Sequence, residues 1–174
     1  MDLIASFNAH KVKTSHFLTV DGILKEGVLY FLFDTGAVCS LIGLNSLFSD
    51  DEQEKKAAFA RILKNELSAQ QVKSRSESLR TANNQKVTTY PCVSHGISIE
   101  GTNERDFYFD FSFEDVSLPL LGTSFSDDCA YSHTINGTLT VTGMKKDAGM
   151  HYYEGRNVLD FDKVTSKFAD LQMQ

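Results

Sequence analysis

A single acidic residue, Asp34, interrupts a stretch at positions 28–42 that is otherwise mostly apolar. An ionised carboxylate that is buried without a partner costs several kcal/mol, so donors must surround it or its pKa must shift. Thr35 supplies a hydroxyl, Gly36 lets the backbone turn and bring N–H groups close to the carboxylate, and Ala37 leaves room above it. This pattern favours a carboxylate with a chemical role. An Asx-type turn between two core strands is the structural alternative.

The elements around Asp34 can be predicted from the same stretch. It is short, rich in Phe, Val and Ile, and bounded by Gly27 and Gly43, which predicts a buried strand, a tight turn and a second buried strand. A helix is predicted at about 50–69, because Ser49 and Glu52 have the spacing of a capping box and apolar residues recur at helical spacing. Further on, Phe107, Phe109, Phe111 and Phe113 alternate with Tyr108, Asp110 and Ser112, which predicts a strand with an aromatic inner face.

The residues Phe31-Leu32-Phe33-Asp34-Thr35-Gly36-Ala37 match, one for one, the motif of apolar residues followed by Asp-Thr/Ser-Gly-Ala. The chain therefore resembles the retropepsin-like aspartic proteases of retroviruses and gypsy-type retrotransposons. The resemblance implies a mainly β fold, a single-lobe barrel. The helix predicted at about 50–69 would be an insertion into it, because retroviral members have a shorter connection here. It also implies catalytic roles for Asp34, Thr35 and Gly36.

Two later segments extend the resemblance in the order that the family has. Residues 79–88 have the pattern of two short strands around a turn. In the family this segment forms the flap over bound peptide, which implies substrate-binding roles for Ala82, Asn83, Asn84 and Gln85, with Asn84 standing where the family usually has Gly. The resemblance also implies a substrate-binding role for Ala37, in the Asp34 motif. The late apolar string then ends in a Gly, as in the family, which implies that the catalytic loop is supported by Leu120, Leu121 and Gly122.

Hydrolysis by this family requires two carboxylates a few Å apart that share one proton, as is established for aspartic proteases. The chain has one suitable residue, since Asp147 follows Met-Lys-Lys and not an apolar strand. The resemblance thus implies a twofold homodimer in which each subunit contributes Asp34. The substrate would be a peptide or polyprotein. The protease domain would span residues 1–141, and residues 142–174 would form a C-terminal extension or a further part of the same domain.

Composition excludes several other functions. The formal net charge of −6 and the pI of about 5.3 argue against nucleic acid or an anionic membrane surface as a partner. The histidines and the three cysteines lack metal-ligand spacing, so no cofactor and no metal is expected. No apolar run suggests a signal peptide or a membrane span, and we expect a cytoplasmic protein.

Two alternatives belong to other functional classes. One is a catalytically inactive, protease-like dimer that serves as a scaffold or binding domain, in which the substitution Asp34→Asn would leave function intact. The other is an unrelated β-barrel with a chance Asp-Thr-Gly, which would be a stable monomer. The intact Asp34-Thr35-Gly36-Ala37 string favours the aspartic endopeptidase.

Overall fold

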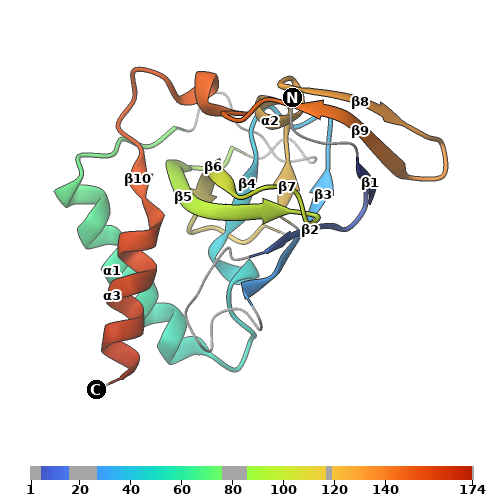
Figure 1. Cartoon of the computed structure of the whole chain (residues 1–174). Helices are drawn as coiled ribbons and strands as arrows, with labels where there is room; N and C mark the ends of the chain where they lie inside the picture. The colour runs from blue at the N-terminus through green and yellow to red at the C-terminus, as the bar shows by residue number, and fades with distance from the viewer. Residues whose placement is uncertain (1–4, 16–26, 76–85, 117–118, 174) are drawn as a thin grey trace.

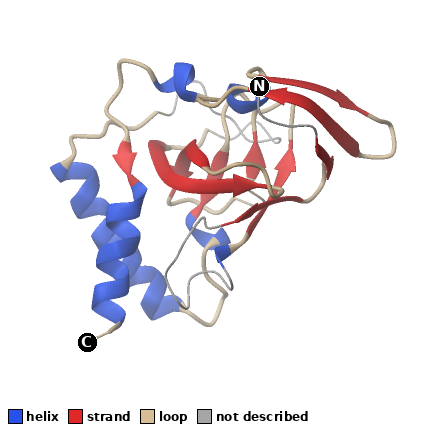
Figure 2. Cartoon of the chain, viewed as in Figure 1, coloured by secondary structure: helices blue, strands red, loops and turns tan. Residues whose placement is uncertain are grey.

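The fold is described from a computed structural model, for residues 5–15, 27–75, 86–116 and 119–173. More of its residues lie in strands than in helices, and the two long helices lie together on one side (Figures 1 and 2). In chain order the elements are β1 Ala5–Asn8, β2 Val12–Ser15, β3 Leu29–Phe33, β4 Leu41–Gly43, η2 Leu44–Ser46, α1 Gln53–Ala69, β5 Tyr90–Ile99, β6 Arg105–Ser112, β7 Leu120–Leu121, α2 Thr123–Ser126, β8 Cys129–His133, β9 Thr138–Met144, η3 Met150–Tyr153, β10 Leu159–Asp160 and α3 Phe161–Gln172.

Six of these strands close into a barrel in the order β5, β2, β3, β7, β4, β6, because β6 also pairs with β5. β10 extends the sheet by pairing in parallel with β5. A separate sheet in the order β1, β9, β8 carries the β8–β9 hairpin, which reaches away from the barrel at the upper right of Figure 1. The predicted mainly β, single-lobe barrel with an inserted helix is confirmed.

Aromatic side chains fill the barrel as the alternation of β6 predicts. Phe107, Phe109 and Phe111 are buried, and the ring centroids of Phe31 and Phe107 lie 5.5 Å apart. Phe113 lies beyond the end of β6 and is only half-buried. Three of the four Phe residues therefore belong to the core, and Phe113 lies at its margin.

The other face of β6 differs from what an alternating strand suggests. A strand with an aromatic inner face would present polar residues to solvent on the other, yet Asp110 and Ser112 are both fully buried. Arg75 and Tyr153 contact the Asp110 carboxylate from parts of the chain that are 35 and 43 residues away. The C-terminal half of β6 is therefore buried on both faces, and one of them contains a polar cluster.

The inserted helix α1 is confirmed, with a later start than expected. The backbone N–H of Ser49 donates to Glu52 Oε1 at 3.1 Å, which is one half of a capping box, but the helix begins only at Gln53. Its buried face presents Phe59 and Leu63 to the core. The pair of Ser49 and Glu52 thus closes a turn before the helix instead of capping it.

The C-terminal residues pack against both the barrel and α1. In α3 the side chains of Phe161, Val164 and Phe168 are buried, and the Phe168 ring lies 5.6 Å from that of Phe59 in α1. Lys167 Nζ also forms an ion pair with the Glu66 carboxylate of α1. Residues 142–174 thus contain a helix that shares the core, and α1 and α3 lie side by side in Figure 1.

No helix in the described part of the chain is long and apolar enough to cross a membrane.

Candidate active site

Asp34 is the first residue after β3, and residues 34–40, here called the Asp34 loop, lead into β4. β3 pairs in parallel with β7, so that Phe33 lies opposite Leu121. The Asp34 N–H then donates to the carbonyl of Leu121 at 3.0 Å. The backbone of Asp34 is therefore fixed by the sheet, while its side chain belongs to the loop.

The loop folds back on the Asp34 carboxylate. The Gly36 N–H donates to Asp34 Oδ1 at 2.8 Å, and the Ala37 N–H donates to the Asp34 carbonyl at 3.2 Å. The side chain of Asp34 is half-buried, whereas Thr35 and Gly36 are exposed. The Gly36 N–H thus fixes the orientation of the carboxylate, and the exposure leaves that carboxylate accessible to water and to a partner molecule.

Strand β7 lies between β3, which leads into the Asp34 loop, and β4, which follows the loop. Leu120 is paired with Leu32 of β3 on one side and with Leu41 of β4 on the other. A strand inserted in this way holds the loop's entry and exit together through main-chain hydrogen bonds. The position of Leu120 and Leu121 fits the supporting role that the sequence resemblance implies for them.

Gly122 lies in direct contact with the Asp34 loop. A Cβ atom at this position would lie 2.4 Å from the main-chain carbon and oxygen of Cys39, and 2.9 Å from the carbonyl oxygen of Ala37. The Gly122 N–H donates to Ser40 Oγ at 3.2 Å, and the next N–H, of Thr123, donates to the Ala37 carbonyl at 2.8 Å. Two backbones meet here, and no side chain fits between them.

The four residues predicted to form the flap tip lie outside the described residues: Ala82, Asn83, Asn84 and Gln85. Their substrate-binding roles, and those of the Asp34 loop residues, remain predictions. The residues on either side of that segment are described. The N–H of Arg75 donates to the Thr89 carbonyl at 2.7 Å, and the N–H of Thr89 donates to the Arg75 carbonyl at 2.8 Å.

A polar cluster behind the loop was not found by sequence reasoning. The buried Asp110 carboxylate accepts hydrogen bonds from Arg75, Thr89 and Tyr153. These donors come from three distant parts of the chain, so no local spacing reveals them. The only signal in the sequence is an acidic residue within the aromatic strand β6.

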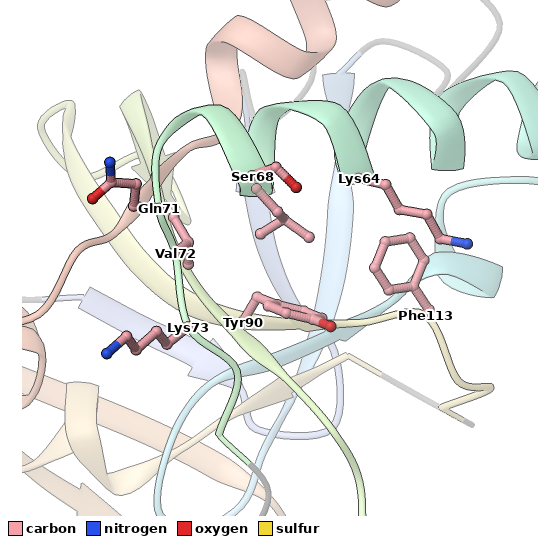
Figure 3. A pocket seen from close by; sticks show the side chains of 8 residues that line it. Lys64, Ser68, Gln71, Val72, Lys73, Tyr90 and Phe113 are labelled. Carbon is pink, nitrogen blue, oxygen red and sulfur yellow. The ribbon is translucent and has the colours of Figure 1, made fainter.

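An open pocket of about 510 Å³ lies at the C-terminal end of α1 (Figure 3). The aromatic rings of Tyr90 and Phe113 form one wall, with centroids 5.9 Å apart, and Lys64 Nζ lies 5.5 Å from the centre of the Phe113 ring. None of its lining residues belongs to the Asp34 loop. The pocket is thus separate from the candidate catalytic carboxylate.

One group of potential metal ligands occurs among the described residues. His95, Asp160 and Asp162 bring ligand atoms within 4.8 Å of one another. Each already has a protein partner, since His95 Nδ1 contacts Asp106, the Asp162 carboxylate accepts from the His95 N–H, and Asp160 caps α3. Sequence spacing missed this group because His95 is 65 or more residues from Asp160 and Asp162. Its contacts are those of a helix cap.

Comparisons with known proteins give similarity at the level of structure. No protein-family model and no curated protein sequence matches the chain. A retropepsin-like aspartic protease from Rickettsia conorii aligns at 14% identity over 81% of this chain and 93% of that one, with a TM-score of 0.43. An EIAV protease in complex with an inhibitor aligns at 14% identity over 74% of this chain and 88% of that one, with a TM-score of 0.33. The first of these bears the name of the family that the Asp34 motif resembles.

Proposed function

We propose that this chain is an aspartic endopeptidase that is active as a homodimer. The observation that carries the proposal is the position of Asp34, the first residue after β3. Its half-buried carboxylate accepts a hydrogen bond from the Gly36 N–H at 2.8 Å. The loop around it is fixed by β7 and Gly122 and remains open to solvent. This is a preorganised carboxylate with access to water, as hydrolytic chemistry requires.

The chemistry follows from two such carboxylates that share one proton. The ionised Asp34 of one subunit takes a proton from a water molecule, whose oxygen attacks the carbonyl carbon of the peptide bond. The protonated Asp34 of the other subunit donates its proton to the carbonyl oxygen. Collapse of the tetrahedral intermediate breaks the C–N bond. The leaving nitrogen takes up the proton that the first Asp34 gained from water, and one hydroxyl of the intermediate returns a proton to the second Asp34. The dyad is then restored with one proton.

The surface next to Asp34 is suited to a second copy of the chain. Thr35, Gly36 and Val38 are exposed, and Val38 retains 46% of its accessible area although it is apolar. β8 is the outer strand of its sheet, and its Tyr131 ring packs on Phe33 with centroids 5.2 Å apart. An isologous dimer that brought the two Asp34 loops together would cover these groups. Activity should therefore fall on dilution below the dimer dissociation constant.

The test is cleavage of a mixed peptide library between about pH 4 and 7, where carboxylate dyads titrate. The wild-type chain is compared with Asp34→Asn, at a concentration where sedimentation shows a dimer. We expect cleavage by the wild type alone. A dimer that cleaves nothing in either form would refute the endopeptidase and favour the scaffold or binding domain. A wild-type chain that stays monomeric at every concentration would refute the dimer.

A further inference from the structure

Asp110 lies directly behind the Asp34 loop, at the end where the loop joins β4. In the parallel pairing of β4 and β6, Asp110 is the partner of Leu41, and its N–H donates to the Ser40 carbonyl at 2.8 Å. Its side chain is fully buried. The C-terminal end of the loop is thus held to Asp110 by a main-chain hydrogen bond.

Donors surround the Asp110 carboxylate. Oδ1 accepts from Arg75 Nη2 at 2.7 Å and from the Tyr153 hydroxyl at 2.9 Å, and Oδ2 accepts from Thr89 Oγ1 at 2.6 Å. The negative charge of this carboxylate also acts on the Cys39 thiol. A buried carboxylate with this many donors has one favourable position, because a shift in any direction would break a hydrogen bond.

The Tyr153 hydroxyl and the Cys39 thiol keep their protons over the physiological pH range. Burial, reinforced by the negative charge of Asp110, raises the pKa of the Cys39 thiol and the pKa of the Tyr153 phenol well above their ordinary values. Cys39 belongs to the Asp34 loop. Asp110 therefore holds this end of the loop at Ser40, next to Cys39, by a main-chain hydrogen bond.

Aromatic rings hold the cation that pairs with Asp110. The guanidinium carbon of Arg75 lies 4.7 Å from the ring centre of Tyr152 and 4.6 Å from that of Tyr153. Contact with two rings stabilises the cation in a site with little water. Tyr153 thus acts twice, as a ring beside Arg75 and as a hydroxyl donor to Asp110.

The cluster can influence Asp34 through Gly122. Any displacement of Cys39 would press on Gly122, since the two backbones are too close to admit a Cβ atom. Gly122 follows Leu121, whose carbonyl accepts the Asp34 N–H. The path from Asp110 to Asp34 therefore consists of main-chain contacts that have little room to adjust.

We propose that Asp110 is a positioning residue of the candidate active site, and that Tyr153 is the donor by which the C-terminal segment completes this support. The proposal rests on the endopeptidase function proposed above. It assigns a role to the chain beyond residue 141, outside the part that resembles the protease family. The C-terminal segment is then a component of the site and not only a cover for the barrel.

The test uses Tyr153→Phe, which removes one hydroxyl and keeps the ring beside Arg75. We expect kcat to fall about tenfold while KM stays within about twofold, because substrate contacts are unchanged and the loop is less well placed. Hydrogen exchange at residues 34–40, followed by mass spectrometry, should become about tenfold faster. The matched control is Tyr108→Phe, whose ring stacks on Tyr153 at 5.5 Å and which has no described contact with Asp110. This control should change neither quantity.

A second variant guards against an effect confined to one side chain. Thr89→Val removes another donor to Asp110 with little change in volume, and it should shift kcat and loop exchange in the same direction. Unchanged loop exchange in Tyr153→Phe, or equal changes in Tyr108→Phe, would overturn the positioning role. A KM effect without a kcat effect would overturn it as well. If the wild type cleaves nothing, the endopeptidase proposal fails, and loop exchange alone still decides whether Asp110 and Tyr153 hold the loop.

Discussion

Two carboxylates border the same loop and have opposite environments. Asp34, within the loop, is half-buried, and among the described residues its side chain accepts one hydrogen bond, from the Gly36 N–H. Asp110, behind the loop, is fully buried and accepts from a guanidinium and two hydroxyls. A carboxylate with free lone pairs and access to solvent can exchange protons with water. One that is buried among three donors is suited to hold its neighbours in place.

Under the proposed function, this difference separates a residue that performs chemistry from one that positions it. Changes at Asp110 should first affect stability and loop geometry, and changes at Asp34 should affect turnover with little effect on folding. The exposed side of the loop is then free for a second subunit, because the folded chain itself holds the loop from the interior. Each prediction below tests one part of this division.

The largest effect on stability is expected for Asp110→Asn. This substitution leaves the Arg75 cation buried without its partner charge, which should lower the free energy of unfolding by about 3–5 kcal/mol. Asp106→Asn is the control, because this carboxylate lies on the same strand but is 53% exposed and should cost less than about 1 kcal/mol. Urea titrations of both variants measure the difference. Equal and small losses of unfolding free energy in the two variants would show that the buried Asp110 contributes no more to stability than the exposed Asp106.

A smaller effect is expected at the contact between Gly122 and the loop. Gly122→Ala places a Cβ atom 2.4 Å from main-chain atoms of Cys39, so we expect a loss of about 1–3 kcal/mol and faster hydrogen exchange in the loop. Gly36→Ala brings a Cβ atom only to 3.1 Å from Asp34 Oδ1 on the exposed side, and it should cost less than about 1 kcal/mol. Thermal unfolding monitored by circular dichroism compares the two. A greater loss of stability in Gly36→Ala than in Gly122→Ala would contradict the inference that the loop is held from its interior side.

The smallest effect is expected for Glu66, a third carboxylate that is remote from the loop. Hydrogen bonds from Lys167, and then from Gln70, lower the pKa of the Glu66 carboxyl. Because the pKa is lowered in the folded state, this group stabilises the fold above the ordinary carboxyl range and stops doing so as pH falls through the lowered value. Glu66→Gln should therefore cost less than about 1 kcal/mol at pH 7 and nothing at about pH 2.

The measurement is the free energy of unfolding of the wild-type chain and of Glu66→Gln as a function of pH. The exposed residue Asp170, on α3, provides the control Asp170→Asn. Peptide cleavage at neutral pH should be the same in all three chains, because the pair of Glu66 and Lys167 joins α1 to α3 and does not contact the loop. A loss of cleavage in Glu66→Gln alone would show that the helices influence the site.

Sequence reasoning reached those features that depend on local pattern. The strand, turn and strand around Asp34 follow from an apolar stretch with one acidic residue, and the helix at 50–69 follows from helical periodicity. The aromatic face of β6 was predicted in the same way. Each of these needs only residues that are close together in the chain.

The features that were missed depend on contacts between distant residues. The burial of Asp110 requires Arg75 and Tyr153, which are 35 and 43 residues away. Its place in an alternating strand indicated only that it lies on the face opposite the Phe residues, and not that this face is covered by distant parts of the chain. The late start of α1 has a local cause, since Ser49 and Glu52 bond to each other in a turn ahead of the helix. Capping-box spacing is the same in both arrangements, and sequence alone does not distinguish them.

The most direct test of a site shared between two subunits is to mix them. Wild-type chain at a fixed concentration is titrated with excess Asp34→Asn chain, allowed to exchange subunits, and assayed for cleavage of a peptide that the wild type cuts. A site that needs Asp34 from both subunits predicts that cleavage falls toward zero as mixed dimers replace wild-type dimers. Cleavage that stays constant, with mixed dimers shown by mass spectrometry, would contradict the shared dyad.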